Sequence, residues 1–530
     1  MPANNSSPDS PHSPAQSSWL NSVLERIERI GNRLPHPTLL FIYLCFGVVI
    51  ISALCKALGV SAIAPNSSDV LEAKSLISVE GLHYILGNTV KNFVSFAPVG
   101  SVLLAVLGIG IAEHSGLIDA VLRRTVLRAP ARLVTFFVVL ASVLSSIALD
   151  TGYVVLIPLA ALIFQALGRP PIAGIVAAFA GVSGGFSANI IVGPLDAILA
   201  GISTESAQLV DSSYHVSVTG NYYFIVASTL LISVIGTWVT EKITVHLLAQ
   251  EPEPQKLDSS GSSDTSTYKG KHKALQAVAG EQRGLRAAGI VSLIFFALLI
   301  AATAGSDGIL RDPQTGSLLR SPFMQGIVVL ISLYAALTGL AFAKFSKQKW
   351  KSSFLVEAME KHMATMTSYL VLMFFAAQFV NYFGWTQLGI ISAIQGAGVL
   401  SALELPKPIL LISFIFLAAL LNLLIGSASA KWALIAPVFV PMFLLLGIAP
   451  EATQMAYRIG DSSTNIITPL MPYFGVVIAV AQQYKNDLGI GTLISLMLPY
   501  SLSFLIGWTA LLVLWATFKL PLGPGAHLFL

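Results

Sequence analysis

The sequence predicts an all-α polytopic membrane protein with about nine transmembrane helices and two re-entrant hairpins, arranged as an inverted repeat. Hydrophobic residues make up 55% of the chain and charged residues only 11%, whereas soluble proteins carry roughly 25% charged residues. Several apolar runs reach the length of about 20 residues that a membrane-crossing helix needs. Two short motifs, residues 187–195 and 463–470, have nearly the same sequence and lie inside such apolar segments.

Both motifs contain an Asn, a hydroxyl residue and a Pro, and these residues predict a break in each helix. A broken helix leaves backbone groups unpaired at bilayer depth, which is tolerated only beside a polar cavity inside the protein. Broken helices at corresponding positions of two halves are typical of the binding site of a secondary transporter.

The first part of the chain is polar and then basic. Residues 1–35 are rich in Ser, Pro and Asn, which predicts a disordered tail. Arg26, Arg29 and Arg33 place this tail in the cytoplasm, because cytoplasmic flanks are enriched in Lys and Arg. Residues 36–246 form the first membrane half, which opens with a crossing over residues 37–58.

A polar external segment is expected up to about residue 98, followed by an inward crossing over residues 99–117. The first hairpin spans residues 133–168, because each of its arms is too short to cross. The first broken helix spans residues 174–204, and a crossing over residues 222–240 returns to the cytoplasm.

Residues 247–286 are hydrophilic and rich in Ser and Lys, which predicts a cytoplasmic linker between the halves. The second membrane half, residues 287–530, contains three crossings, a segment along the interface, a hairpin, a broken helix and a final crossing. Their expected bounds are, in that order, residues 287–303, 323–343, 354–382, 389–403, 408–447, 452–480 and 490–517.

The two halves align with almost one spacing. Pro158 matches Pro437, and Asn189 matches Asn465. An odd number of crossings separates the two hairpins, so the second half is expected to be inverted in the membrane. The binding site should then lie near the bilayer midplane.

Ionisable residues inside a membrane are costly, and each is therefore a candidate for function. Five are found here: Asp150, Asp196, Lys431, Arg458 and Asp461. Asp196 could also lie at the outer mouth of its helix. Arg458 and Asp461 are three residues apart, so they could also form a local helix pair.

Arg458 can anchor a carboxylate, because its planar guanidinium donates two parallel hydrogen bonds. Asp461 could hold that guanidinium, ligate a cation or accept a proton. Trp432 suits either stacking on an aromatic substrate or packing against the adjacent helix. Lys431 could attract an anion, stand where a cation would otherwise bind, or extend into an aqueous cavity.

The coupling ion is either Na⁺ or H⁺, because hard oxygen ligands suit Na⁺ and a carboxylate also suits H⁺. We expect no cofactor, no metal beyond Na⁺, no nucleic-acid partner and no enzymatic activity; Cys45 and Cys55 share one apolar segment and predict no disulfide framework. The candidate ion-coupling residues are Ser146, Asp150, Asn189, Gly426, Ser427, Asp461 and Asn465.

Several long motifs resemble the p-aminobenzoyl-glutamate transporter (AbgT) family, and the resemblance covers nearly the whole chain from about Arg29 onward. They are residues 90–98, 181–189, 376–380, 426–432, 457–469 and 523–525.

The resemblance implies a homodimer in the bacterial inner membrane, with a bowl open to the cytoplasm and a core that moves against an outer scaffold. It implies uptake of p-aminobenzoyl-glutamate or efflux of sulfonamides. The family's functional residues match Asp196, Ser429, Trp432, Pro450, Arg458, Asp461 and Pro469, and we add Asn189, Lys431 and Asn465 as candidate substrate contacts.

Three other interpretations remain at this level. A Na⁺-coupled dicarboxylate symporter would share the two-hairpin plan. An ion channel could be built on the same re-entrant loops. An intramembrane enzyme is disfavoured, because no constellation of nucleophile, base and oxyanion donors is visible.

Overall fold

The computed structural model describes residues 36–63, 70–148, 152–249, 280–305, 307–318, 321–346, 353–471, 473–486 and 488–530. In these ranges the chain is almost entirely helical, and the only sheet pairs β1 (Ser61–Ile63) with β2 (Val70–Glu72). Seven described helices are long and apolar enough to cross a membrane, or nine if two bent pairs each count as one span. The predicted all-α polytopic fold is therefore confirmed. The predicted tail, residues 1–35, lies outside the described residues.

The membrane part begins with α2 (Pro37–Ala57) and continues through α3 (Val79–Val94), α4 (Ala97–His114) and α5 (Leu117–Leu127). The predicted polar external segment up to about residue 98 contains α3, which together with α4 makes one candidate membrane span, Val79–His114. Ser78 caps α3 by accepting a hydrogen bond from the backbone N–H of Gly81 at 3.1 Å, and this supports an amphipathic helix that weak hydropathy had obscured.

The first hairpin consists of α6 (Val134–Leu144), a short turn η2 (Ser145–Ala148), the π-helical turn η3 (Gly152–Leu156) and α7 (Ile157–Ala166). The first broken helix follows as α8 (Pro171–Phe179), η4 (Ala180–Gly184) and α9 (Pro194–Ala207). Residues 185–193 form the non-helical break. Asp150 lies outside the described residues.

The chain then crosses through α10 (Tyr222–Val239), which continues into η5 (Thr240–Thr244) and α11 (Val245–Ala249). The next helix is α13 (Glu281–Thr303). Helices therefore extend into both ends of the predicted linker, residues 247–286, and its middle part, residues 250–279, lies outside the described residues. Glu281 forms a 2.7 Å ion pair with Arg123 of α5, and this contact holds the polar first turn of α13 against the membrane part.

The second half contains α14 (Pro322–Gln325), α15 (Ile327–Phe345), α16 (Phe354–Thr365), α17 (Thr367–Trp385) and α18 (Leu388–Ala402). The second hairpin is α19 (Lys407–Asn422) and α20 (Ala428–Leu445). The second broken helix is α21 (Pro450–Thr464), η6 (Asn465–Ile467) and α22 (Phe474–Gln482), and α23 (Ile490–Thr517) closes the chain. A bend of 118° separates α18 from α19.

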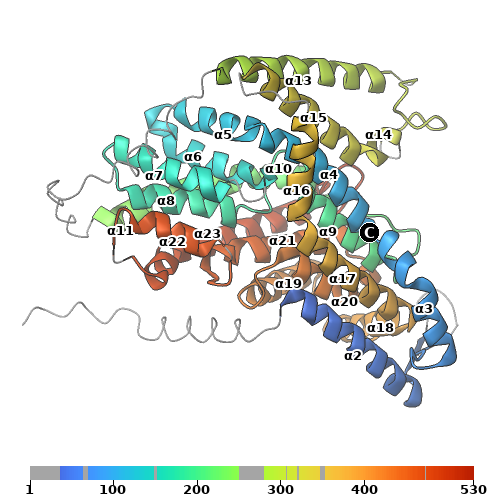
Figure 1. Cartoon of the computed structure of the whole chain (residues 1–530). Helices are drawn as coiled ribbons and strands as arrows, with labels where there is room; N and C mark the ends of the chain where they lie inside the picture. Colours follow the sequence, from blue (N-terminus) through green and yellow to red (C-terminus); the bar gives the residue numbers. More distant parts are fainter. Residues whose placement is uncertain are drawn as a thin grey trace, which may run out of the picture.

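The helices surround a central group formed by α9, α19, α20, α21 and α23 (Figure 1). Helices α13 and α15 lie along one edge in that view, and α2, α3, α17 and α18 extend at the opposite corner. One large core of buried residues runs through α6 to α10 and α19 to α23. The polar site described below lies inside this core.

Candidate functional site

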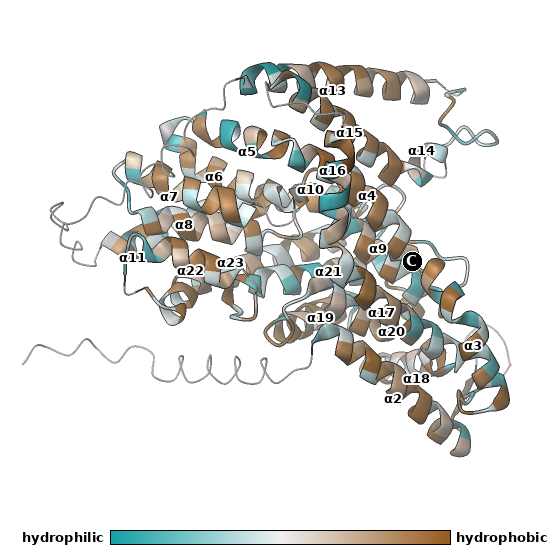
Figure 2. Cartoon of the chain, in the orientation of Figure 1, coloured by the Kyte–Doolittle hydropathy of each residue, from teal (hydrophilic) through white to brown (hydrophobic). Residues whose placement is uncertain are grey.

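Helix α21 is polar and yet wholly inside the protein. All of its residues, Pro450–Thr464, are buried, and Figure 2 shows it as a pale helix among brown ones. Pro450 occupies the first helical position, where its missing N–H is harmless. Beyond η6, Pro469 prevents the helix from continuing. A buried polar helix must find partners for its side chains, and these partners define the site.

Arg458 of α21 forms an ion pair with Asp196 of α9, with 2.6 Å between Nη1 and Oδ1. A second guanidinium nitrogen donates to the backbone carbonyl of Ser187 at 3.1 Å. Arg458 therefore connects the second broken helix to both sides of the break in the first. Its Nε is buried and has no hydrogen-bond partner among the described residues.

Asp196 is fixed by the start of α9. Its Oδ2 accepts a 2.7 Å hydrogen bond from the backbone N–H of Gly193, and a negative charge in the first turn is favoured by the helix dipole. Pro194 occupies the first helical position. The alternative that Asp196 lies at an open outer mouth is wrong for this conformation, because the residue is only 6% exposed.

Lys431 of α20 forms the second ion pair, with Nζ 2.5 Å from Oδ1 of Asp461 and both side chains 1% exposed. Its ammonium also donates to the side-chain carbonyl of Asn422. Lys431 does not extend into an aqueous cavity, since no part of it reaches the surface. Arg458 and Asp461 do not form a local pair either, because each has a partner on another helix.

Asn422, at the end of α19, joins these elements. Its amide nitrogen donates to the backbone carbonyl of Asp461 at 2.7 Å and to the side-chain oxygens of Thr464 and Asn465 at 2.9 Å. Asn465 thus contacts the hairpin rather than an open cavity. Asn422 is not among the residues predicted from the sequence, although a single Asn in a largely apolar hairpin arm is a detectable signal.

Trp432 is completely buried and packs against Tyr457 of α21, with ring centroids 4.7 Å apart. Its indole N–H contacts the carbonyl of Leu199 at 3.2 Å and the hydroxyl of Ser203 at 3.1 Å. In this conformation the ring fills the space between α9 and α21, as in the packing alternative, and no face of it is open to a substrate.

The first break holds a smaller polar group. The amide of Asn189 donates to the hydroxyl of Ser146 at 2.9 Å, and its carbonyl oxygen accepts from the backbone N–H groups of Ile190 and Ile191. The hairpin tip and the break are therefore in contact, as they are in the second half.

The remaining candidates lie around the second hairpin tip. Ser427 caps α20, and its hydroxyl is 3.5 Å from that of Ser429. A Cβ on Gly426 would come within 2.7 Å of the carbonyl of Leu470, so only glycine allows the tip to approach the second break this closely.

Two further functional candidates were missed. Tyr457 donates to the carbonyl of Ala428 at 2.6 Å and lies 3.3 Å from Oδ1 of Asp461. Glu451 is a buried carboxylate in the first turn of α21 and accepts from the hydroxyl of Tyr214 at 2.9 Å. Burial and the neighbouring Glu451 raise the pKa of Tyr214, which lies in the loop after α9.

Taken together, these features define the class of protein. A multi-pass membrane fold carries two buried ion pairs where two broken helices and a hairpin tip meet, which is the construction of a transporter site. The chain belongs to the AbgT putative transporter family, whose pattern matches residues 22–530.

The chain is similar to the p-aminobenzoyl-glutamate transport protein of Escherichia coli (strain K12), with 39% identity over 94% of this chain and 96% of that protein. It is also similar to two transporters of known structure. The YdaH transporter of Alcanivorax borkumensis shares 49% identity and superposes with a TM-score of 0.86, covering 92% of this chain and all of that chain.

MtrF of Neisseria gonorrhoeae, described as illuminating a class of antimetabolite efflux pumps, shares 46% identity and superposes with a TM-score of 0.89, covering 95% of this chain and all of that chain. The similarity to both solved structures extends over the whole fold. The predicted family and the prediction of a transporter are therefore confirmed.

Proposed function

We propose that this protein is a secondary active transporter of p-aminobenzoyl-glutamate or related p-aminobenzoate-type compounds, including sulfonamide antimetabolites. The observation that carries the proposal is the buried Arg458–Asp196 pair, which joins the two broken helices through one guanidinium. The description of one relative as a p-aminobenzoyl-glutamate transport protein, and of another as an antimetabolite efflux pump, supports the substrate class.

Arg458 is the proposed anchor for the substrate. Its Nε–H lacks a partner among the described residues, so a carboxylate can accept from it without first displacing Asp196. The uncharged end of a p-aminobenzoate-type compound would then lie toward Trp432 and Tyr457, and Asn189, Ser429 and Asn465 would supply polar contacts.

We propose H⁺ as the coupling ion. Asp461 already has a fixed cation, the ammonium of Lys431, at 2.5 Å. A Na⁺ ion bound to the same carboxylate would place two positive charges side by side in a region of low polarity, which is unfavourable. Transfer of a proton from Lys431 to Asp461 instead leaves two neutral groups, and the deprotonated amine can then take up a proton from one side of the membrane.

The oxygens of Ser146 and Asn189 support Na⁺ as the alternative coupling ion, acting at the first break. The side-chain carbonyl oxygen of Asn189 already accepts two backbone hydrogen bonds. The side-chain N–H of Asn189 donates a hydrogen bond to the hydroxyl oxygen of Ser146. These bonds would have to break before Na⁺ could bind, and we therefore favour H⁺.

We further propose that the protein is a homodimer in the bacterial inner membrane, with its N-terminus in the cytoplasm and its two halves inverted relative to one another. The order of elements supports the repeat, because each half has a hairpin followed directly by a broken helix. In the first half these are α6–α7 and α8–α9, and in the second they are α19–α20 and α21–α22.

Flux through proteoliposomes tests the proposal. The purified full-length protein is reconstituted, and labelled p-aminobenzoyl-glutamate or a sulfonamide is followed under a pH gradient alone or a Na⁺ gradient alone. We expect saturable counterflow that responds to the pH gradient. Flux that does not saturate would favour an ion channel, and flux driven only by Na⁺ with a preference for simple dicarboxylates would favour a dicarboxylate symporter.

A further inference from the structure

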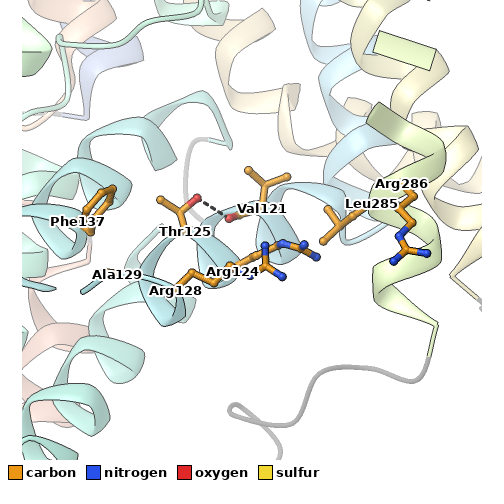
Figure 3. A pocket seen from close by; sticks show the side chains of 8 residues that line it. All are labelled: Val121, Arg124, Thr125, Arg128, Ala129, Phe137, Leu285 and Arg286. Carbon is orange, nitrogen blue, oxygen red and sulfur yellow. Dashed lines mark hydrogen bonds between the residues drawn. The ribbon is translucent and has the colours of Figure 1, made fainter. Parts of the chain in front are cut away.

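A basic cavity lies between α5 and α13, away from the site described above. The cavity has a volume of about 560 Å³, and three arginines line it: Arg124 of α5, Arg128 directly after α5, and Arg286 of α13. Arg124 and Arg128 are one helical turn apart and therefore share a face of α5. Figure 3 shows both side chains together with Leu285 and Arg286 of α13, which line the same cavity.

The three guanidiniums have no counter-charge among the residues that the structure describes. The nearby Arg123 is paired with Glu281 at 2.7 Å, but no ion pair joins Arg124, Arg128 or Arg286 to a described carboxylate. Three positive charges that face one open cavity repel each other. A multivalent anion such as a phosphate would relieve this repulsion and accept hydrogen bonds from the guanidiniums.

Contacts outside the cavity hold α13 in position. The Arg123–Glu281 pair is largely buried and holds the start of α13 on α5. Close packing follows one turn later, where a Cβ on Gly284 would lie 2.8 Å from the ring of Phe342 in α15. The spacing between α5 and α13 is therefore set by contacts outside the cavity.

An apolar cavity of about 380 Å³ continues from the basic one. The two share Val121, Thr125 and Leu285. The deeper part has a mostly apolar lining that comes from α4, α5, α13 and α15, with the hydroxyl groups of Ser292, Tyr334 and Thr338 as polar exceptions. It ends against Leu144 and Ile147 at the tip of the first hairpin, and against Ile190 and Ile191 in the first break.

The surroundings indicate what occupies this space. α13 is a candidate membrane span of which almost no residue is buried in the single chain, so the cavity opens beside a helix with an exposed apolar surface that suits contact with lipid. Basic pockets between transmembrane helices bind the headgroups of anionic lipids. A basic mouth that leads into an apolar channel matches the two ends of one phospholipid.

We propose that this cavity binds one anionic phospholipid. Its phosphate group lies among Arg124, Arg128 and Arg286, and an acyl chain fills the apolar extension. The chain end then contacts Ile147 and Ile190, which flank the Ser146–Asn189 hydrogen bond of the transport site. The lipid thereby packs against the tip of the first hairpin.

A soluble substrate matches the cavity less well. A small dicarboxylate would neutralise the arginines but leave the apolar extension empty. A zwitterionic lipid would fill the apolar extension with its acyl chain, but the cationic group of its headgroup would lie close to the three arginine guanidiniums. Only an anionic lipid satisfies both parts of the cavity.

Lipid binding to the full-length protein tests the proposal. Delipidated protein in detergent is titrated with phosphatidylglycerol or with phosphatidylcholine of the same acyl chains, and bound lipid is counted by native mass spectrometry. We expect one tightly held phosphatidylglycerol. The triple change Arg124→Gln, Arg128→Gln and Arg286→Gln should weaken it roughly tenfold or more, as expected for three charges near a lipid headgroup.

Two matched variants separate charge and shape. Lys242→Gln removes an exposed cation outside the cavity and should leave binding unchanged. Gly289→Leu fills the apolar extension, and it should fold normally because a Cβ there meets no atom within 4 Å. It should therefore displace the acyl chain and weaken phosphatidylglycerol binding while keeping all three arginines.

Three results would overturn the proposal. The first is equal binding of both lipids by the unmodified protein. The second is unchanged phosphatidylglycerol binding in the triple arginine variant. The third is displacement of phosphatidylglycerol by p-aminobenzoyl-glutamate in the unmodified protein but not in the triple arginine variant. The cavity would then be an entrance for substrate.

Discussion

Arg458 and Asp196, which are 2.6 Å apart, belong to different broken helices and hold the two halves of the chain together at the centre of the membrane part. Asp461 lies one turn further along α21 and pairs with Lys431 of α20. Each half therefore contributes to the Arg458 contact, whereas the Lys431 pair is formed entirely within the second half. We assign the first pair to substrate and gating, and the second to ion coupling.

Loss of one partner of the Arg458 pair should destabilise the protein. Arg458→Met leaves Asp196 buried without its cation, and such a change costs about 3–5 kcal/mol in the free energy of unfolding. The double variant Arg458→Met, Asp196→Asn should recover most of that loss and still lack transport. Thermal unfolding in detergent and proteoliposome flux measure the two effects, and transport by the double variant would refute the assigned role.

Lys431 should control the pH dependence of transport. Lys431→Gln keeps a hydrogen-bond donor for Asp461 but removes the ammonium proton that Lys431 would transfer to it. The response of flux to a pH gradient should therefore vanish. Lys407→Gln, which removes a cation outside the site that contacts the carbonyl of Gly447, serves as the control. An unaltered pH response in Lys431→Gln would make Lys431 a structural residue only.

Trp432 should be more important for packing than for a direct substrate contact. Trp432→Phe retains an aromatic ring against Tyr457 and loses the indole hydrogen bonds, at an expected cost of about 0.5–1.5 kcal/mol. Trp432→Ala leaves a large void and should cost about 3–5 kcal/mol. If Trp432→Phe abolishes sulfonamide binding while its thermal midpoint is nearly normal, the ring must contact substrate in another conformation.

Gly460 should tolerate no side chain. A Cβ there would lie 2.3 Å from the carbonyl of Ile415 and 2.8 Å from the backbone nitrogen of Ala419, so Gly460→Ala forces α21 away from α19. Gly475→Ala on α22 is the control, because its Cβ meets nothing within 4 Å. The control should gain roughly 0.5–1 kcal/mol from helix propensity. Equal thermal midpoints for both variants would contradict the close packing of α19 and α21.

Asp119, on the short helix α5 outside the candidate spans, should oppose stability at neutral pH. Burial raises its pKa, although Arg123 lowers it in part, and Oδ1 has no partner among the described residues. The folded protein therefore holds this proton more tightly than the unfolded chain does, and stability falls as pH rises through the raised pKa. Asp119→Asn should remove this fall and raise the thermal midpoint at neutral pH.

Asp211 provides the control of opposite sign. Hydrogen bonds from Ser213 lower its pKa, so its contribution is present above its ordinary pKa and is lost as pH falls through the lowered one. Asp211→Asn should therefore slightly lower the midpoint at neutral pH. Midpoints of both variants that follow the unmodified protein at every pH would refute both assignments.

The amino-acid sequence was enough to predict the membrane character, the breaks in two helices and the buried polar residues. These features follow from local composition: apolar runs must be helical in lipid, and Asn, Pro and Gly at bilayer depth require a polar interior. Charged residues such as Lys431, Arg458 and Asp461 were identifiable for the same reason. The polar first turn of α13 was not, because its contact with Arg123 of α5 comes from outside its own segment.

The pairing of the buried charges depends on how the helices pack in three dimensions. Arg458 and Asp461 are close in sequence, but their side chains leave α21 toward different neighbours, α9 and the α19–α20 hairpin. Partners separated by 262 residues cannot be inferred from spacing along one helix. Asn422 could not be predicted for the same reason. It joins the hairpin to α21 and η6 through three hydrogen bonds, and its neighbours in the sequence do not indicate these partners.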